Sequence, residues 1–194
     1  VAAAFALFVA DPPNASLAGR SQIIAWLGGK LIAIDGATEQ PANVLDEPDG
    51  TRLAIPIPGN PAALAKLSHH GRLSWTAQLS PAIALARRGY RVPRFQADIW
   101  NLKFKRLLQI SALHPFLDEN RPYQRGELFR QPALARTLSR LAQAGVDDFY
   151  RGTIARTAVG FLRDRGSTVT VRDWANYRAK EAVVLTTRFA RSTV

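Results

Sequence analysis

The side chains that most often carry out chemistry are scarce in this sequence. Its 194 residues include no Cys and three His, which excludes a cysteine nucleophile, a disulfide and a thiolate metal site within them. His69 and His70 are adjacent near a predicted helix end, and His114 precedes Pro115. These positions lack the spacing of an HExxH-type metal site, and we expect all three histidines at the surface. With no phosphate-binding loop either, the sequence implies no cofactor.

Positive charge is the strongest compositional signal. The chain has 26 Lys and Arg against 15 Asp and Glu, a formal net charge of +11, which favours an acidic partner. The cations stand singly or in pairs such as Arg87 and Arg88, without a basic run. We therefore expect solvated helix faces, or a surface facing a more acidic second chain, and no nucleic acid. A nucleic-acid-binding protein is the weaker alternative, and it predicts salt-sensitive retention on DNA.

The hydrophobic pattern is that of a globular chain. Its hydrophobic content is 47% and its mean hydropathy is −0.09, and no apolar run approaches the roughly 20 residues that cross a bilayer. Residues 1–10 (VAAAFALFVA) have no basic segment before them and are followed by Asp11 and Pro12. We interpret them as a buried helix, and its apolar run is already under way at residue 1, without a capping residue before it. The sequence is therefore expected to be a fragment of a longer chain, forming a single domain over 1–194.

A β-hairpin and several helices must position any site. Residues 22–27 and 30–35 are short apolar runs joined by Gly28 and Gly29, which predicts a hairpin because both glycines can adopt positive φ. A strand is expected over 183–189. Helices are expected from Asn60, acting as the capping residue before Pro61, to His70, and over 74–89, 98–109 and 131–144, the last ending at Gly145. A short turn and then a helix are expected over 147–165, and a helix over 170–177 that starts with a capping box of Thr170 and Asp173. The fold class is α+β.

Three blocks of sequence form a recognisable series. The first runs from PGNPAALA at 58–65 through GRLSW at 71–75 to PAIALARRGY at 81–90. The second has QPALARTL at 131–138 and FYRG at 149–152, and the third is TVRDWANY at 170–177. In order, spacing and identity these blocks resemble the γ-glutamyltranspeptidase family of N-terminal-nucleophile (Ntn) hydrolases over nearly the whole chain, which is identified as the large-subunit portion of a divergent member.

The resemblance implies a fold and a mechanism. The fold is an αββα four-layer sandwich, completed by a small chain that the precursor releases by cutting itself. The new N-terminal Thr of that small chain is the nucleophile, and its own α-amine is the base. No residue of the present sequence is therefore expected to be catalytic. The partners implied are the small subunit and a small-molecule amide or peptide substrate, as in glutathione metabolism.

The large chain of the family contributes one important ligand, an Arg after the second hairpin strand that pairs with the α-carboxylate of the γ-glutamyl group. The family pattern is roughly A.DFRE.AP, and residues 33–41 here read AIDGATEQP. Aligning Asp35 and Pro41 with that pattern puts Ala37 in place of the Arg, followed by Thr38. We therefore expect the carboxylate clamp to be absent.

Arg20 is a second departure from the family, because it stands at the head of the first strand, where the family has a run of glycines. Either it reaches across to replace the missing guanidinium, or it is a solvent-facing residue at a strand end. Arg20, Ala37 and Thr38 are the candidate substrate-binding residues.

The leading hypothesis is an amidohydrolase or acyltransferase of this family. One alternative is a degenerate member that has lost catalysis and acts as a binding or scaffold protein. Another is an acylase of the cephalosporin-acylase kind, with a non-glutamyl acyl substrate. The resemblance favours a periplasmic or extracellular location, because many members are found there.

Overall fold

The computed structural model describes residues 1–42, 55–109, 115–190 and 192–193. The chain divides into two compact units: unit 1 comprises residues 1, 17–75 and 144–194, and unit 2 comprises residues 2–16 and 76–143. The elements of unit 1 are β1 (Ser21–Leu27), β2 (Lys30–Gly36), α2 (Asn60–Ser68), α7 (Val146–Tyr150), α8 (Thr153–Arg163), α9 (Val171–Asn176), β7 (Lys180–Ala182), β8 (Arg188–Phe189) and β9 (Ser192–Thr193). No helix in the described part of the chain is both long and apolar enough to cross a membrane.

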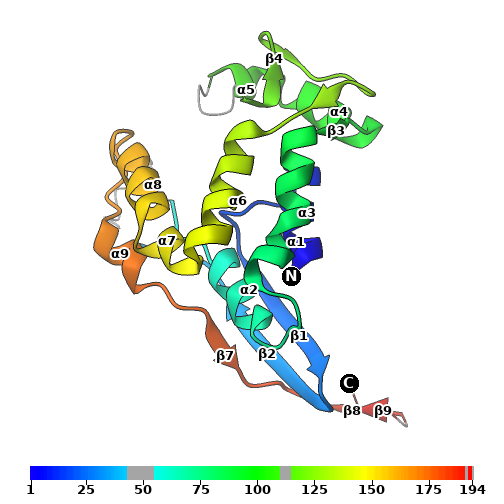
Figure 1. The fold of residues 1–194 in the computed structure, drawn as a ribbon, viewed down its shortest axis with the longest axis vertical. Coiled ribbons are helices and arrows are strands. Elements are labelled where there is room, and N and C mark those ends of the chain that lie inside the picture. Colours follow the sequence, from blue (N-terminus) through cyan, green and yellow to red (C-terminus); the bar gives the residue numbers. More distant parts are fainter. Residues whose placement is uncertain (43–54, 110–114, 191, 194) are drawn as a thin grey trace. The chain divides into compact units, whose positions relative to one another are not determined.

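The expected hairpin forms the centre of unit 1. Strands β1 and β2 pair in antiparallel register from Ser21↔Gly36 to Leu27↔Lys30. Gly28 and Gly29 have φ of 57° and 77°, values that L side chains rarely adopt, so the two glycines allow the tight turn. Strand β7 adds to β2, giving the order β1-β2-β7 (Figure 1).

The two faces of this sheet differ. Helix α2 covers one face, where Ile34 and Ala63 are buried together with half-buried Ile23 and Ile32. Alternate residues of a strand point to opposite faces, and the opposite face of β1 is exposed: Ile24 is 71% exposed and Trp26 70%. An apolar sheet face of this kind normally packs against another layer.

The third strand of this sheet lies earlier in the sequence than expected. The strand predicted over 183–189 was wrong for its first part, because β7 is Lys180–Ala182 and β8 begins only at Arg188. Ion pairs to α2 and to the segment after β2 accompany β7: Glu181 lies 2.9 Å from the Lys66 Nζ and Lys180 3.0 Å from Glu39. These distant pairings determine where the strand forms, and the apolar run after it is exposed, with Val183 at 86%.

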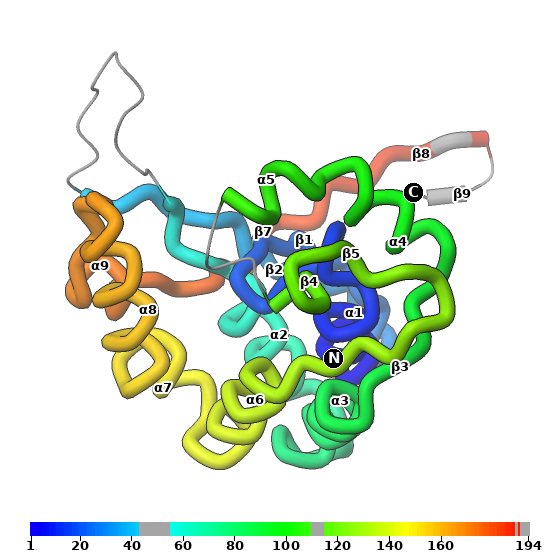
Figure 2. The backbone as a smooth tube through the Cα atoms, turned by 90° about the horizontal axis from the view of Figure 1, so that it is seen from above, coloured from blue at the N-terminus to red at the C-terminus, as the bar shows by residue number. Residues whose placement is uncertain are grey.

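Helices α7, α8 and α9 follow one another closely in unit 1 (Figure 2). The buried Asp148 of α7 accepts hydrogen bonds from the backbone N–H groups of Thr153 (3.0 Å) and Ile154 (3.3 Å). Those N–H groups have no partner within α8, so Asp148 caps that helix from outside. The predicted capping box at the start of α9 is confirmed, with Thr170 and Asp173 each accepting from the other's backbone N–H.

Unit 2 contains the remaining elements. They are α1 (Ala2–Ala10), α3 (Trp75–Arg88), β3 (Tyr90–Arg91), α4 (Arg94–Leu102), α5 (Phe104–Gln109), β4 (Leu117–Asp118), β5 (Arg121–Pro122), β6 (Leu128–Phe129) and α6 (Pro132–Ala144). Phe129 is fully buried and packs against Trp100 with ring centroids 5.0 Å apart. Tyr90 and Tyr123 also meet the Phe129 ring edge-on, so aromatic packing forms this core.

Two helix predictions need correction. The single helix expected over 98–109 is two helices, α4 and α5, separated at Lys103, whose φ of −95° and ψ of 6° interrupt the helical path. Asn60 is not the capping residue of α2, because it is already the first helical residue and Gly59 precedes it as the N-cap.

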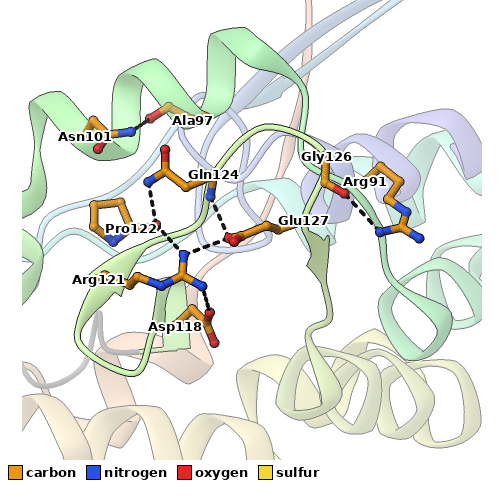
Figure 3. Close-up of polar contacts among 9 residues, drawn as sticks. All are labelled: Arg91, Ala97, Asn101, Asp118, Arg121, Pro122, Gln124, Gly126 and Glu127. Carbon is orange, nitrogen blue, oxygen red and sulfur yellow. Dashed lines mark hydrogen bonds and ion pairs between the residues drawn. The ribbon is translucent and has the colours of Figure 1, made fainter.

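A polar network holds the β4–β5 hairpin of unit 2 (Figure 3). The Arg121 guanidinium donates to Asp118 and to Glu127, the second at 2.9 Å. Glu127 also accepts from the backbone N–H of Gln124 at 2.7 Å. Both contacts hold the pKa of Glu127 below its usual value, with the Arg121 hydrogen bond as the larger cause. These charges satisfy one another and fix the loop.

Candidate functional site

Arg20 and Ala37 occupy matching positions at the open end of the hairpin. Ser21↔Gly36 is the last pair of the β1–β2 ladder, so Arg20 precedes that pair on one strand and Ala37 follows it on the other. Arg20 is exposed, and Ala37 and Thr38 are half-buried. Two of the three predicted site residues are therefore brought to the same end of the same strand pair, and Thr38 is their neighbour in the chain.

The backbone at Ala37 is held from two sides. Its N–H donates to the Asp35 carboxylate at 2.8 Å. Its carbonyl accepts from the Tyr177 hydroxyl at 2.6 Å. Glu39 then pairs with Ile57 through two backbone hydrogen bonds, of 3.2 and 2.7 Å. The segment from Asp35 to Glu39 thus has a defined path although it belongs to no strand.

Tyr177 is itself held by a second tyrosine. Its ring stacks on that of Tyr150, with centroids 5.2 Å apart and an interplanar angle of 13°. The Tyr150 hydroxyl donates to the Pro58 carbonyl at 2.7 Å and accepts from the Ala62 N–H at 3.2 Å. Because α2 begins between Pro58 and Ala62, this hydroxyl fastens the start of that helix.

Both phenols remain protonated under ordinary conditions. Burial raises the pKa of Tyr177 to about 12, and the nearby charges of Glu39 and Asp35 act in the same direction. Burial also raises the pKa of Tyr150 well above its ordinary value. Each hydroxyl is therefore a hydrogen-bond donor to a carbonyl rather than a proton carrier.

The backbone at Gly59 also lies close to the backbone at Gly19 and Gly36, which adds support to the strand end that carries Arg20 and Ala37. The N–H groups of Gly59 and Asn60 both donate to the Gly19 carbonyl, at 2.9 and 3.1 Å, which fixes the peptide just before Arg20. A Cβ at Gly59 would collide with the Gly36 carbonyl oxygen and the Tyr177 hydroxyl. Only glycine fits at this position without a shift of the backbone.

Four of these supporting residues were missed as site residues from the sequence. Gly59, Tyr150 and Tyr177 stand in the three sequence blocks described above, and Gly36 follows Asp35. The available signal was their place in the motifs, since neither composition nor periodicity indicates that they meet. Of the histidines, His69 and His70 are exposed as expected and His114 lies outside the described residues. The described residues contain no cluster of acidic, His or Cys side chains suited to a metal.

A family model of γ-glutamyltranspeptidase matches residues 1–194. The chain belongs to the γ-glutamyltranspeptidase family. It is 36% identical to glutathione hydrolase proenzyme 2 of Schizosaccharomyces pombe over 140 residues, which are 71% of this chain and 23% of that protein. The chain spans 23% to 34% of the length of the curated relatives that it matches.

Solved structures show the same fold. Helicobacter pylori γ-glutamyltranspeptidase superposes with a TM-score of 0.92 at 26% identity, covering 100% of this chain and 60% of that one. The cephalosporin acylase of Bacillus halodurans gives 0.88 at 27% identity, covering 96% and 38%. The expected α+β fold of the Ntn hydrolases is confirmed for this γ-glutamyltranspeptidase-family chain.

The arrangement supplies recognition rather than a reactive group. It offers an exposed guanidinium, a small methyl side chain at residue 37 and a rigid backbone segment around it.

Proposed function

We propose that this chain is the acyl-binding part of an amidohydrolase or acyltransferase whose Thr nucleophile begins a second chain of the same precursor. Acyl transfer would proceed by attack of the Thr hydroxyl on the substrate amide, with loss of the amine and formation of an acyl-enzyme ester. Water or an amine then takes the acyl group. Residues 1–194 contribute the surface that binds and orients the acyl group.

The convergence of distant motifs carries this proposal. Gly59, Tyr150 and Tyr177 lie up to 118 positions apart in the sequence. Tyr177 nevertheless donates to the Ala37 carbonyl, Gly59 lies against the carbonyl of Gly36, and Tyr150 stacks on the Tyr177 ring. Buried hydroxyls that stabilise a short irregular segment are typical of a site that must keep its shape. That segment is where the family places its acyl-carboxylate ligand.

Arg20 is the proposed replacement for that ligand. Arg20 and Ala37 are the residues next to the last ladder pair, Ser21↔Gly36, so the long Arg20 side chain starts at the same end of the hairpin as residue 37. Arg20 has no carboxylate partner among the residues that the structure describes. Lys180, the other cation beside this strand end, is already paired with Glu39 at 3.0 Å.

The exposed apolar face of the sheet supports a second chain. Ile24 and Trp26 lie on the face of β1 away from α2, where the second sheet of an αββα sandwich would stack. The Schizosaccharomyces pombe relative is a proenzyme by name, which fits a precursor cut into two chains.

The second candidate function is an acylase with a non-glutamyl substrate. It is favoured by Ala37, which stands where the family has its carboxylate-binding Arg. Loss of a charge-assisted bidentate contact costs on the order of 2–4 kcal/mol, or about two to three decades in affinity. A substrate without an α-carboxylate avoids that loss, and the likeness to a cephalosporin acylase supports this version.

The first experiment is intact-mass measurement and N-terminal sequencing of every chain in a preparation of the full-length protein. A second chain that begins with Thr supports the proposal. An unprocessed precursor, or a second chain with another first residue, contradicts it and favours the scaffold alternative.

The second experiment compares acyl p-nitroanilides with and without a γ-glutamyl group. If Arg20 binds the carboxylate, Arg20→Ala raises KM for the γ-glutamyl substrate about tenfold or more and leaves the others unchanged. Arg163→Ala, an exposed Arg at the end of α8, is the control. Ala37→Arg would restore the family's ligand and lower KM for the γ-glutamyl substrate selectively. An equal response to both anilides would contradict the assignment of residues 20 and 37.

A further inference from the structure

A pocket lies wholly within unit 2, formed by the loop after α1, the helices α4 and α5, and Phe116. It has a volume of about 270 Å³. Its lining is mainly apolar and includes two cationic side chains, Lys103 and Arg106. The other lining residues are Pro12, Pro13, Ile99, Trp100, Leu107 and Phe116. This volume is at the small end of ligand pockets in proteins, so it suits a ligand of about ten heavy atoms.

Both cations of the pocket come from the junction of α4 and α5. Lys103 donates its N–H to the Ile99 carbonyl at 2.9 Å, and Leu107 donates to the Lys103 carbonyl at 3.0 Å. These two hydrogen bonds tie the junction to the helices on either side of it. Lys103 and Arg106, three residues apart in the sequence, both line the pocket.

The aromatic part of the pocket lining is firmly packed. Trp100 is 4% exposed and packs against Phe116 with ring centroids 6.3 Å apart. Because both rings are held in place, they offer a fixed apolar surface to the hydrocarbon part of a ligand.

The cations at the mouth lack the partners that other cations of this unit have. Arg121 is paired with Asp118 and Glu127 (Figure 3), and Arg94 lies 3.6 Å from Asp98. Neither Lys103 nor Arg106 forms an ion pair with any described residue. Asp11, the acid next to the Pro12 wall, accepts instead from the Asn14 side chain at 3.1 Å.

We propose that this pocket binds a small amphiphilic carboxylate, with its apolar tail against Pro13, Trp100 and Phe116 and its carboxylate between Lys103 and Arg106. Burial of each CH₂ of the tail is favourable, and two cations that line the same pocket attract a single anionic head group. The site is independent of the strand end at residues 20 and 37, because it uses other residues and requires no acyl transfer.

Octanoate is the probe, titrated by calorimetry into the full-length protein. Octan-1-ol is the neutral control with the same tail. Single replacement of Lys103→Gln or Arg106→Gln is expected to weaken octanoate up to about fivefold, since exposed ion pairs are individually weak, and the double variant about tenfold or more. Lys105→Gln is the matched control. Lys105 is an exposed residue of α5, the helix that carries Arg106, but it does not line the pocket.

Charge reversal keeps the test decisive if the wild-type affinity is low. The double variant Lys103→Glu/Arg106→Glu should prefer octylammonium to octanoate, and a thermal scan checks that each variant remains folded. Saturable octanoate binding that the pocket variants weaken and Lys105→Gln does not weaken would support the site. No saturable binding, equal binding of octan-1-ol, or an equal effect of Lys105→Gln would overturn it.

Discussion

Replacing Tyr177 by Phe should loosen the segment from Asp35 to Glu39 without disturbing the core. The change removes only the hydroxyl that donates to the Ala37 carbonyl at 2.6 Å. The ring keeps its stack on Tyr150, at 5.2 Å between centroids. Tyr177 is 2% exposed, so its packing is expected to persist.

The magnitude follows from what happens to the carbonyl. A buried acceptor left without its partner costs about 1–3 kcal/mol. Ala37 is half-buried, so water can reach its carbonyl in part, and the lower part of the range, about 1–2 kcal/mol, is expected. Such a change in local opening free energy corresponds to about 5–30-fold faster amide exchange.

Hydrogen exchange read by mass spectrometry on peptides covering 35–39 measures this locally. Tyr123→Phe is the matched control, because its phenol hydroxyl forms no hydrogen bond with any of the residues that the structure describes. Substrate KM should rise with the exchange rate if the segment positions the acyl group. Exchange at 35–39 no faster in Tyr177→Phe than in Tyr123→Phe would refute the reasoning.

Three further changes have defined outcomes. Gly59→Ala should destabilise unit 1 by about 2 kcal/mol or more, measured by urea denaturation, because its Cβ would collide with the Gly36 carbonyl; a neutral result would contradict the close approach. Asp148→Ala should cost about 1–2 kcal/mol through loss of the α8 cap, visible as faster exchange over 153–156. In the folded protein the pKa values of Tyr150 and Tyr177 are raised above about 10, which is the value for an unfolded chain. The contribution of the two protonated phenols to stability is therefore complete below pH 10 and is lost as the pH rises toward 12. Phenolate absorbance that appears near pH 10 in the folded protein would contradict this burial.

Local signals in the sequence were sufficient wherever the chemistry is local. Gly28 and Gly29 predicted the hairpin turn, and they adopt the positive φ that such a turn needs. Gly145, with φ of 79°, follows α6 as expected. The capping box of Thr170 and Asp173 needs only residues three apart, and it is present as predicted.

Features that depend on distant partners were not predictable in the same way. The apolar residues after Ala182 suggested a strand, but pairing with β2 and the ion pairs of Lys180 and Glu181 place β7 earlier. The hydrogen bond between Tyr177 and Ala37 joins residues 140 positions apart. No spacing rule indicates such a contact, although the motif containing Tyr177 was already recognisable.

The contacts around Ala37 also explain how substrate recognition can change without loss of the fold. Its N–H and its carbonyl are held through the backbone, by Asp35 and Tyr177, so neither contact depends on the side chain at position 37. An Arg there can therefore be replaced by Ala while the segment keeps its path. Arg20 is exposed at the matching strand end, and a change there is equally free of the core. If residues 20 and 37 contact the acyl group as proposed, acyl specificity can vary at these two positions, while the buried tyrosines and Gly59 maintain the scaffold that presents them.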